Sequence, residues 1–227
     1  MEQKAVLCDS SSLISLTDGD LDHVLLFLKK NFPINFYIPP SVEEEMVTRP
    51  IKSDLKEYLF SAIRLKKQMR DGIITKVDSD VKAETDKILK MANNIFFVRG
   101  QPMRLMHEGE AEMVAMAKSL AISTLLVDER TTRLLIENPF QLKSHLEQEF
   151  KVNVMVQKTN LTNLAEYVKG MEVIRSSEIV VLAYENRYFD DYGDMHVAIL
   201  RAALYRLKYS GCSIRFQEIE DFVRGLK

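Results

Sequence analysis

Residues 5–16 read AVLCDSSSLISL, and this stretch decides the fold. Its first four residues are apolar, as in a strand that is buried on both faces of a sheet. The run stops at Asp9, and the serines after it can cap a helix that contains Leu13, because their hydroxyls accept hydrogen bonds from free N–H groups. Asp9 is therefore expected at the carboxyl end of a central strand, where ligands bind in open α/β sheets. The alternative, that Asp9 is only a helix N-cap, stays open on this stretch alone.

Length and composition indicate an ordinary globular protein. The chain has 227 residues, of which 46% are hydrophobic and 28% charged, enough for one large domain or for one domain with an appendage. No apolar run approaches the roughly 20 residues of a membrane helix, and the N-terminus does not resemble a signal peptide, which predicts a cytoplasmic protein without membrane contact. Cys8 and Cys212 form neither a metal-binding nor a disulfide pattern.

The net charge of −2 argues against a non-specific nucleic-acid coat protein, which is usually strongly basic. A polyanionic substrate must then be held by local basic patches or by metal ions that neutralise an acidic cluster.

Short apolar runs alternate with segments of helical periodicity. The expected strands lie at residues 5–8, 35–38, 123–127 and 152–156, with a further short one at 73–77. This alternation predicts an α/β fold with a parallel sheet and helices on both of its faces. Residues 1–174 are expected to form this domain, with a mostly helical insertion at about 51–106. Residues 175–227 are expected to form a helical C-terminal appendage.

Acidic residues recur at one predicted edge of the sheet. Asp9 and Asp128 each follow an apolar strand, and two helices open with glutamates, at 43–45 and at 110 and 112. Helix dipoles or capping explain any single one of these acids. Their recurrence at one edge instead favours a site for a hard divalent cation, Mg²⁺ or Mn²⁺, and the lack of accompanying His or Cys argues against zinc. Such a site polarises a phosphodiester and generates hydroxide for in-line attack.

Several segments resemble, in order, the motifs of PIN-domain proteins. They are DSSSLISL at 9–16, PPSVEEEM at 39–46, GEAEMVAMAK at 109–118 and LLVDERTTRLL at 125–135, and TNLTNLAEYVKGMEVI at 159–174 resembles the closing segment of a prokaryotic branch. The resemblance covers residues 4–48 and 107–174, about half of the chain. It implies a three-layer α/β/α fold and Mg²⁺- or Mn²⁺-dependent endonuclease activity on RNA.

The resemblance also implies a set of site residues. The catalytic and metal-binding acids match Asp9, Glu45, Glu110 and Asp128. Glu112 is held in reserve for Glu110, because the two side chains point about 200° apart on a helix and cannot both face one metal. Ser10 or Ser11 takes the place of a small hydroxyl residue that often helps to hold a metal-bound water in the family.

The resemblance also bears on the expected partners and on alternative functions. RNA is the expected substrate, and Arg130 or Arg133 is a candidate phosphate contact, although surface placement also explains both arginines. Toxin-type members of the family are much shorter, and a homodimer and an antitoxin-like protein partner stay open. Two other functions are a catalytically weak or inactive RNA-binding or assembly module, and a phosphoryl-transfer enzyme with a nucleophilic aspartate. The latter usually has a second aspartate two positions on, where this chain has Ser11.

Overall fold

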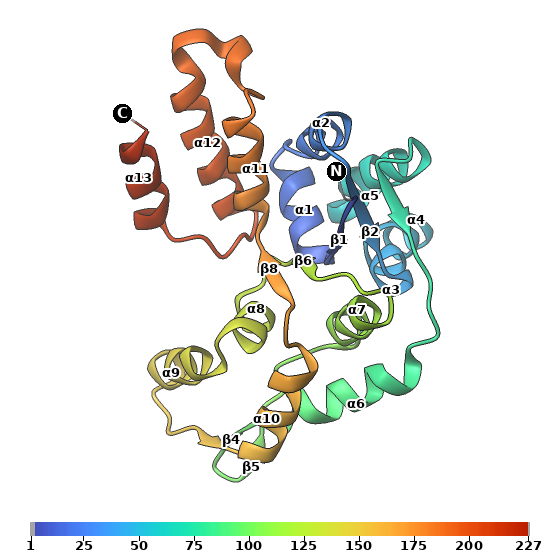
Figure 1. Ribbon diagram of the computed structural model, residues 1–227, viewed down its shortest axis with the longest axis vertical. Helices are drawn as coiled ribbons and strands as arrows, with labels where there is room; N and C mark the ends of the chain where they lie inside the picture. Colours follow the sequence, from blue (N-terminus) through green and yellow to red (C-terminus); the bar gives the residue numbers. More distant parts are fainter. Residues whose placement is uncertain (1–2, 227) are drawn as a thin grey trace.

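A computed structural model describes residues 3–226 of the chain, and its centre is a sheet of five parallel strands (Figure 1). The strand order is β3-β2-β1-β6-β8, so the opening strand β1 lies in the middle. The bounds are Ile74–Lys76 for β3, Ile34–Ile38 for β2, Lys4–Cys8 for β1, Thr124–Leu126 for β6 and Glu172–Ile174 for β8. The predicted α/β class with a parallel sheet is therefore confirmed.

Helices cover both faces of this sheet, and each face has its own hydrophobic core. Side chains alternate between the faces along a strand, so in β1 Cys8 belongs to one core and Leu7 to the other. In β6, Leu126 shares the core of Cys8, whereas Leu125 shares that of Leu7. Burial on both sides explains why these strands are continuous apolar runs instead of alternating ones. The arrangement is compatible with a three-layer α/β/α fold.

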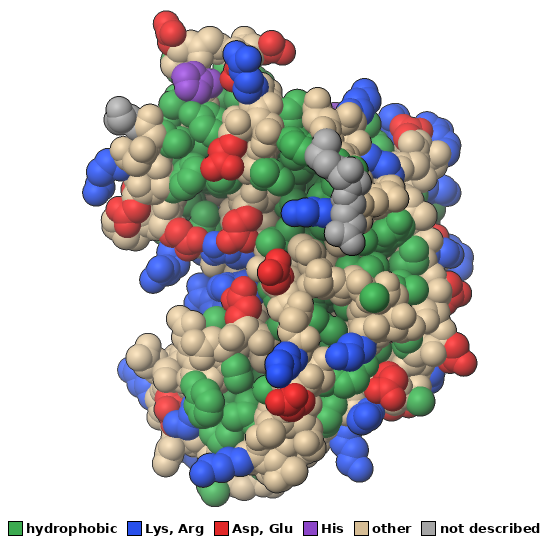
Figure 2. All heavy atoms as spheres, viewed as in Figure 1, with side chains coloured by type: hydrophobic (Ala, Val, Ile, Leu, Met, Phe, Trp, Pro, Cys, Tyr) green, Lys and Arg blue, Asp and Glu red, His purple; other side chains and the backbone are tan. Residues whose placement is uncertain are grey.

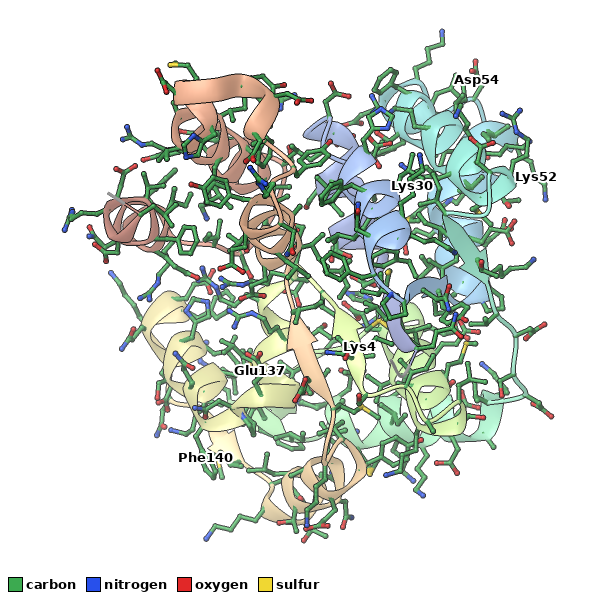
Figure 3. The ribbon with its side chains drawn as sticks, turned by 45° about the horizontal axis from the view of Figure 1, so that its top comes forward. Lys4, Lys30, Lys52, Asp54, Glu137 and Phe140 are labelled. Atoms are coloured by element: carbon green, nitrogen blue, oxygen red, sulfur yellow. The ribbon has the colours of Figure 1, made fainter. Side chains whose placement is uncertain are left out.

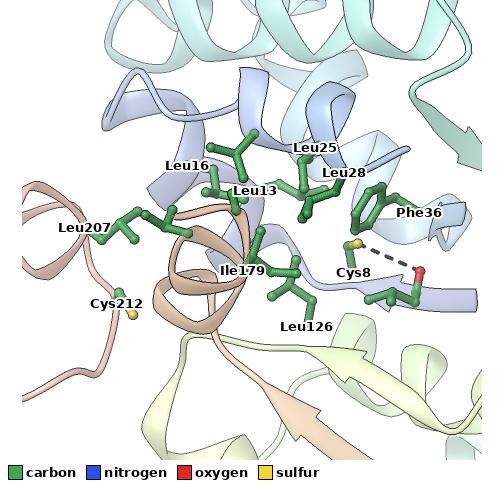
Figure 4. Packing of buried hydrophobic residues seen from close by; sticks show 14 of the residues in the cluster. Cys8, Leu13, Leu16, Leu25, Leu28, Phe36, Leu126, Ile179, Leu207 and Cys212 are labelled. Atoms are coloured by element: carbon green, nitrogen blue, oxygen red, sulfur yellow. Dashed lines mark hydrogen bonds between the residues drawn. The ribbon is translucent and has the colours of Figure 1, made fainter. Parts of the chain in front are cut away.

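One helical layer packs on the Cys8 face, and Figure 4 shows its interior. It contains α1 (Ser10–Asp18), α2 (His23–Asn31) and α5 (Lys56–Arg70), with a helical stretch formed by α3 (Pro40–Glu43), the π-helix η1 (Glu44–Thr48) and α4 (Arg49–Lys52). Pro50 lies in the first turn of α4, where its missing N–H is tolerated.

The other helical layer packs on the Leu7 face. It contains α6 (Lys82–Ala92), α7 (Glu108–Ser119), α8 (Arg130–Glu137), α9 (Pro139–Phe150) and α10 (Lys158–Tyr167). Alanines and methionines of α7 are fully buried against the sheet, which explains their recurrence at helical spacing.

The predicted insertion at 51–106 is interwoven with the main fold. Its strand β3 forms an edge of the parallel sheet by pairing with β2, while α5 and α6 enter the two opposite cores through Leu65 and Ile88. Its last part contributes β4 (Phe96–Val98) and β5 (Gln101–Pro102) to a small antiparallel sheet, whose third strand is β7 (Met155–Val156) from a later part of the chain. These residues supply parts of both layers.

The apolar run at 152–156 does not enter the parallel sheet, contrary to the prediction. Its β7 strand pairs antiparallel with β4, and Met155 is 65% exposed. The place beside β6 is taken by β8, which the sequence did not indicate because its three residues are only partly buried and follow Gly170 closely.

The C-terminal segment is helical, as predicted. It comprises α11 (Ser176–Glu185), the 3₁₀ helix η2 (Asp190–Met195), α12 (His196–Tyr209) and α13 (Phe216–Gly225). Helix α11 packs against α1 and α2, α12 against α11, and α13 against α12. Buried residues such as Ile179 and Leu207 share one core with Leu13 of α1 (Figure 4). The tail thus completes one of the two helical layers.

Within residues 3–226, the structure contains no helix whose length and hydropathy would allow it to cross a membrane.

Candidate active site

The carboxyl ends of β1 and β6 lie side by side, as the sequence suggested. Cys8 is paired with Leu126, and the backbone N–H of Asp9 donates to the carbonyl of Leu126 at 2.9 Å. The helices α1, α7 and α8 begin near this edge, so their first residues can contribute side chains to it.

Asp9 is both a strand-end residue and the N-cap of α1. One oxygen of its carboxylate accepts hydrogen bonds from the backbone N–H of Ser11 at 3.2 Å and from the Ser11 hydroxyl at 2.6 Å. The side chain is nonetheless almost entirely buried, with 4% of the residue exposed. This desolvation raises the pKa of Asp9 above its usual value, and the negative charge of Glu45 adds to the shift. Asp9 is therefore a helix N-cap and, at the same time, a buried acid at the carboxyl end of a strand.

Glu110 lies in the first turn of α7 and faces the same site. Its carboxylate accepts a hydrogen bond from the Thr132 hydroxyl at 3.1 Å and another from the backbone N–H of His107. Burial is the main cause that raises its pKa to about 7, and the negative charges of Asp9 and Glu129 raise it further. Two carboxylates on different elements are thus brought into electrostatic contact in a poorly solvated place.

The structure separates the two glutamates of the GEAE segment. Glu110 interacts with Asp9, whereas the Glu112 carboxylate accepts a hydrogen bond from the backbone N–H of Ser41 at 3.1 Å. Glu112 therefore ties α7 to the start of α3, on another side of the helix.

Glu45 is exposed and lies in the π-helix η1, beside the site and not inside it. Its link to the pair is its charge, which contributes to the raised pKa of Asp9. Short π-helical turns recur at functional sites, because the extra residue redirects the side chains around it. Ser10 opens α1 and is 9% exposed, while Ser11 is the serine that contacts the Asp9 carboxylate.

The carboxylate of Asp128 does not join the pair of Asp9 and Glu110, which departs from the predicted four-acid site, although the backbone N–H of Asp128 donates to the Ser11 hydroxyl at 3.3 Å. Its carboxylate accepts hydrogen bonds from the backbone N–H of Ser176 at 2.7 Å and from the Ser176 hydroxyl at 2.6 Å. Its carbonyl also accepts from the backbone N–H of Ser213 at 3.2 Å. The residue is fully buried. In this structure the aspartate attaches the C-terminal tail to the sheet.

The reason lies in the register of β1 and β6. Cys8 pairs with Leu126, so Asp9 corresponds to Val127 and Asp128 lies one residue further along. A shift of one residue turns a side chain to the opposite face of a sheet. Val127 indeed packs in the core shared with Leu7 and α7. The side chain of Asp128 therefore faces the C-terminal tail. The side chain of the next residue, Glu129, lies on the side of α7.

Glu129 is the acid that the sequence analysis missed. Its carboxylate caps α8, accepting hydrogen bonds from the backbone N–H groups of Thr131 at 2.8 Å and Thr132 at 2.6 Å. Its charge also contributes to the raised pKa of Glu110. The DER triplet held both acids, but only the strand register distinguishes them.

The side chains at this site are of the right chemical type for a hard cation, but few of them lie close together. Carboxylate oxygens are the ligands that Mg²⁺ and Mn²⁺ prefer, and two desolvated acids with raised pKa values favour a nearby positive charge. Within the described part of the chain, however, no three side chains of His, Cys, Asp or Glu are close enough to hold a metal ion together. The pair of Asp9 and Glu110, flanked by Glu45 and Glu129, is the arrangement present.

Comparisons with known proteins add no assignment, since no family model, curated protein or solved structure matches the chain.

Proposed function

We propose that this chain is a metal-dependent endoribonuclease with a PIN-like three-layer fold that hydrolyses RNA phosphodiesters through Mg²⁺ or Mn²⁺. The observation that carries the proposal is the pair of desolvated carboxylates, Asp9 and Glu110, at the sheet edge, where burial raises the pKa of both. Two acids that repel each other at a sheet edge destabilise the fold unless a proton or a cation accompanies them. Such a cost at a ligand-binding edge suggests a functional role.

Two carboxylates are enough for the proposed ion. Mg²⁺ keeps several of its waters and is commonly held by one or two carboxylates together with substrate phosphates. Asp9 and Glu110 would hold it, with Glu129 and Glu45 adding negative charge nearby. A bound ion supplies Lewis-acid activation of the phosphodiester and of water.

Two hydroxyl groups of the chain orient the carboxylates of the proposed site. The Ser11 hydroxyl fixes one oxygen of Asp9, and the Thr132 hydroxyl fixes one oxygen of Glu110. These bonds hold the two carboxylates in a set orientation before any ion arrives, which lowers the cost of binding one.

The test uses a 5′-labelled single-stranded RNA with Mn²⁺ as the activating ion. Asp9→Asn and Glu110→Gln are expected to lower the cleavage rate at least about a hundredfold, the range found when one electrostatic group of an active site is removed. Glu112→Gln is the matched control, because it makes the same change two residues along α7 where the side chain contacts Ser41. Cleavage by Glu110→Gln at the parental rate would falsify the proposal.

A second readout does not depend on activity. Mn²⁺ should raise the melting temperature of the parent and of Glu112→Gln, because an ion that binds only the folded state stabilises it. Asp9→Asn and Glu110→Gln should lose this shift.

One observation favours a second candidate, a non-catalytic RNA-binding or assembly module. Asp128 is engaged by Ser176, and within residues 3–226 the close pair consists of two acids. This alternative predicts RNA or partner binding that ignores both EDTA and Asp9→Asn, with no cleavage by the parent in Mn²⁺.

A further inference from the structure

A polar cleft of about 660 Å³ lies between the helices α8 and α9 and the C-terminal tail. Four arginines line it: Arg130 and Arg133 on one wall, Arg175 and Arg215 on the other. Figure 2 shows basic side chains, with some acidic ones, gathered at the notch between these parts of the molecule. In Figure 3, Glu137 and Phe140 mark the junction where α8 and α9, the helices of the first wall, meet.

Helix α9 turns a hydrogen-bonding stripe toward the cleft. Gln141, Ser144, His145 and Gln148 line it, at the spacing i, i+3, i+4 and i+7 that defines one face of a helix. The opposite side of the same helix is anchored in the core by Leu142 and Leu146. The orientation of the polar stripe is therefore fixed by packing, and the stripe lines the same cleft as the arginines of the tail.

Carboxylates of the chain position two of the guanidinium groups. Arg133 pairs with Glu137 at 2.9 Å, and Arg175 bridges Glu178 at 2.8 Å and Glu218 at 2.5 Å. Glu218 is the one carboxylate among the lining residues, and it lies 3.9 Å from Arg215 as well.

Arg130 has a different environment. It contacts the His145 ring at 3.4 Å, that ring pairs with Glu149 at 3.1 Å, and within residues 3–226 no carboxylate forms an ion pair with Arg130.

Two buried polar atoms at the cleft have no partner. In the described part of the chain, the Nε of Arg133 and the hydroxyl of Ser213 are buried and make no hydrogen bond. Buried polar groups in folded proteins are almost always paired, and unpaired ones call for an explanation such as a bound molecule. Both atoms belong to residues that line the cleft, so the polar lining of the cleft is not fully paired within the described part of the chain.

The cleft begins where the acid pair ends. Arg130 follows Glu129 directly, and Thr132, between the two arginines of α8, donates to the carboxylate of Glu110. The first turn of α8 therefore borders the acid pair and the arginine-lined cleft at once.

We propose that this cleft binds the phosphodiester backbone of single-stranded RNA extending from the acid pair, with the C-terminal tail supplying one wall. The inference rests on the proposed function for the identity of its ligand. Guanidinium groups recognise phosphate oxygens through paired hydrogen bonds. The amides and hydroxyl of α9 match the edges of unpaired bases and the 2′-hydroxyls, which a single strand presents freely.

The test measures RNA affinity by fluorescence anisotropy of a labelled single-stranded 12-mer in EDTA, so that cleavage does not interfere. Arg130→Gln with Arg215→Gln removes one guanidinium from each wall. The double variant is expected to raise Kd at least about tenfold and to reduce the slope of log K against log salt by about 1.4, since each lost phosphate contact on a single strand contributes about 0.7. Arg187→Gln with Arg224→Gln is the control, because these exposed arginines lie outside the cleft and remove the same charge.

A gain of affinity excludes a folding defect as the explanation. Glu218→Gln removes the lining carboxylate that competes for Arg175, and the variant is expected to bind the RNA about threefold more tightly. Equal affinity of the cleft and control double variants, or no binding of the 12-mer to the parent, overturns the inference. Cleft-dependent binding by a parent that cuts nothing in Mn²⁺ supports the cleft and rejects the nuclease. If the parent cleaves RNA but the cleft variants bind it as tightly as the parent does, the nuclease is supported and the cleft is rejected.

Discussion

The ends of β1 and β6 are two equivalent places that the fold uses differently. Each strand is buried on both faces, each is followed by a buried aspartate, and the two are hydrogen-bonded neighbours. Asp9 turns toward α7 and meets other acids, whereas Asp128 turns toward the tail and meets the hydrogen-bond donors of Ser176. The two aspartates are chemically identical and both follow a strand, but Asp128 lies one residue further along the sheet than Asp9 does. This offset in register decides which aspartate stabilises the fold and which one carries a cost.

The largest expected effect is that of Asp128→Ala. The change leaves the buried N–H and hydroxyl of Ser176 without an acceptor, and each such group costs about 1–3 kcal/mol. We expect the free energy of unfolding to fall by about 3 kcal/mol, measured by urea denaturation followed by circular dichroism. A loss below about 1 kcal/mol would show that Asp128 does not hold the tail.

The next effect is a pH dependence caused by Glu110. Its pKa is raised from 4.5 to about 7 in the folded protein, so folding takes up a proton between these two values. Stability is therefore lowest above pH 7 and increases as the pH falls from about 8 to about 5, by on the order of 2 kcal/mol. Urea midpoints across this range should follow this trend in the parent and much less in Glu110→Gln. A parent whose stability is flat from pH 8 to 5 contradicts the assignment.

Asp9→Asn is expected to stabilise the protein, whereas Asp128→Ala is expected to destabilise it. Burial and Glu45 raise the pKa of Asp9, which means that its charge opposes folding near neutral pH. Removing the charge while keeping an acceptor for Ser11 should raise the free energy of unfolding by about 1 kcal/mol at pH 8. The same comparison of denaturation curves measures it, and a marked destabilisation would place Asp9 with Asp128 as a structural residue.

The smallest effect is that of Glu129→Gln. The amide oxygen still accepts one hydrogen bond at the start of α8 but loses the charge that favours the helix dipole, a change of about 0.5 kcal/mol. The pKa of Glu110 should fall as well, because one of its negative neighbours is gone. Titration of Glu110 by NMR in the parent and in the variant measures this shift, and an unchanged pKa would remove Glu129 from the site.

Much of the architecture was readable from the sequence because local signals and burial agree there. The run before Asp9, the run before Asp128 and the alanine-rich helix after Glu108 are unambiguous in length and periodicity. The strand β8 was missed because a three-residue edge strand has almost no periodicity to detect. The apolar run at 152–156 was assigned to the parallel sheet because burial alone does not say which sheet a strand joins.

The site shows a sharper limit. A strand that is buried on both faces has no polar side to fix its register, so the sequence could not say whether Asp128 or Glu129 faces Asp9. The role of Ser176, 48 residues from Asp128, likewise depends on a contact that no local pattern announces.

The bond between Asp128 and Ser176 also has a consequence for the order of folding. The carboxylate of Asp128 finds its hydrogen-bond donors only when α11 has packed against the sheet. The backbone carbonyl of Asp128 finds its donor only when residue 213 has been added. During synthesis, β1 and β6 can pair while the C-terminal fifth of the chain is still absent, but the sheet edge then carries an unpaired charge. The last helices remove this unpaired charge when they dock, so a chain that ends before residue 176 is expected to leave the carboxylate of Asp128 without its donors.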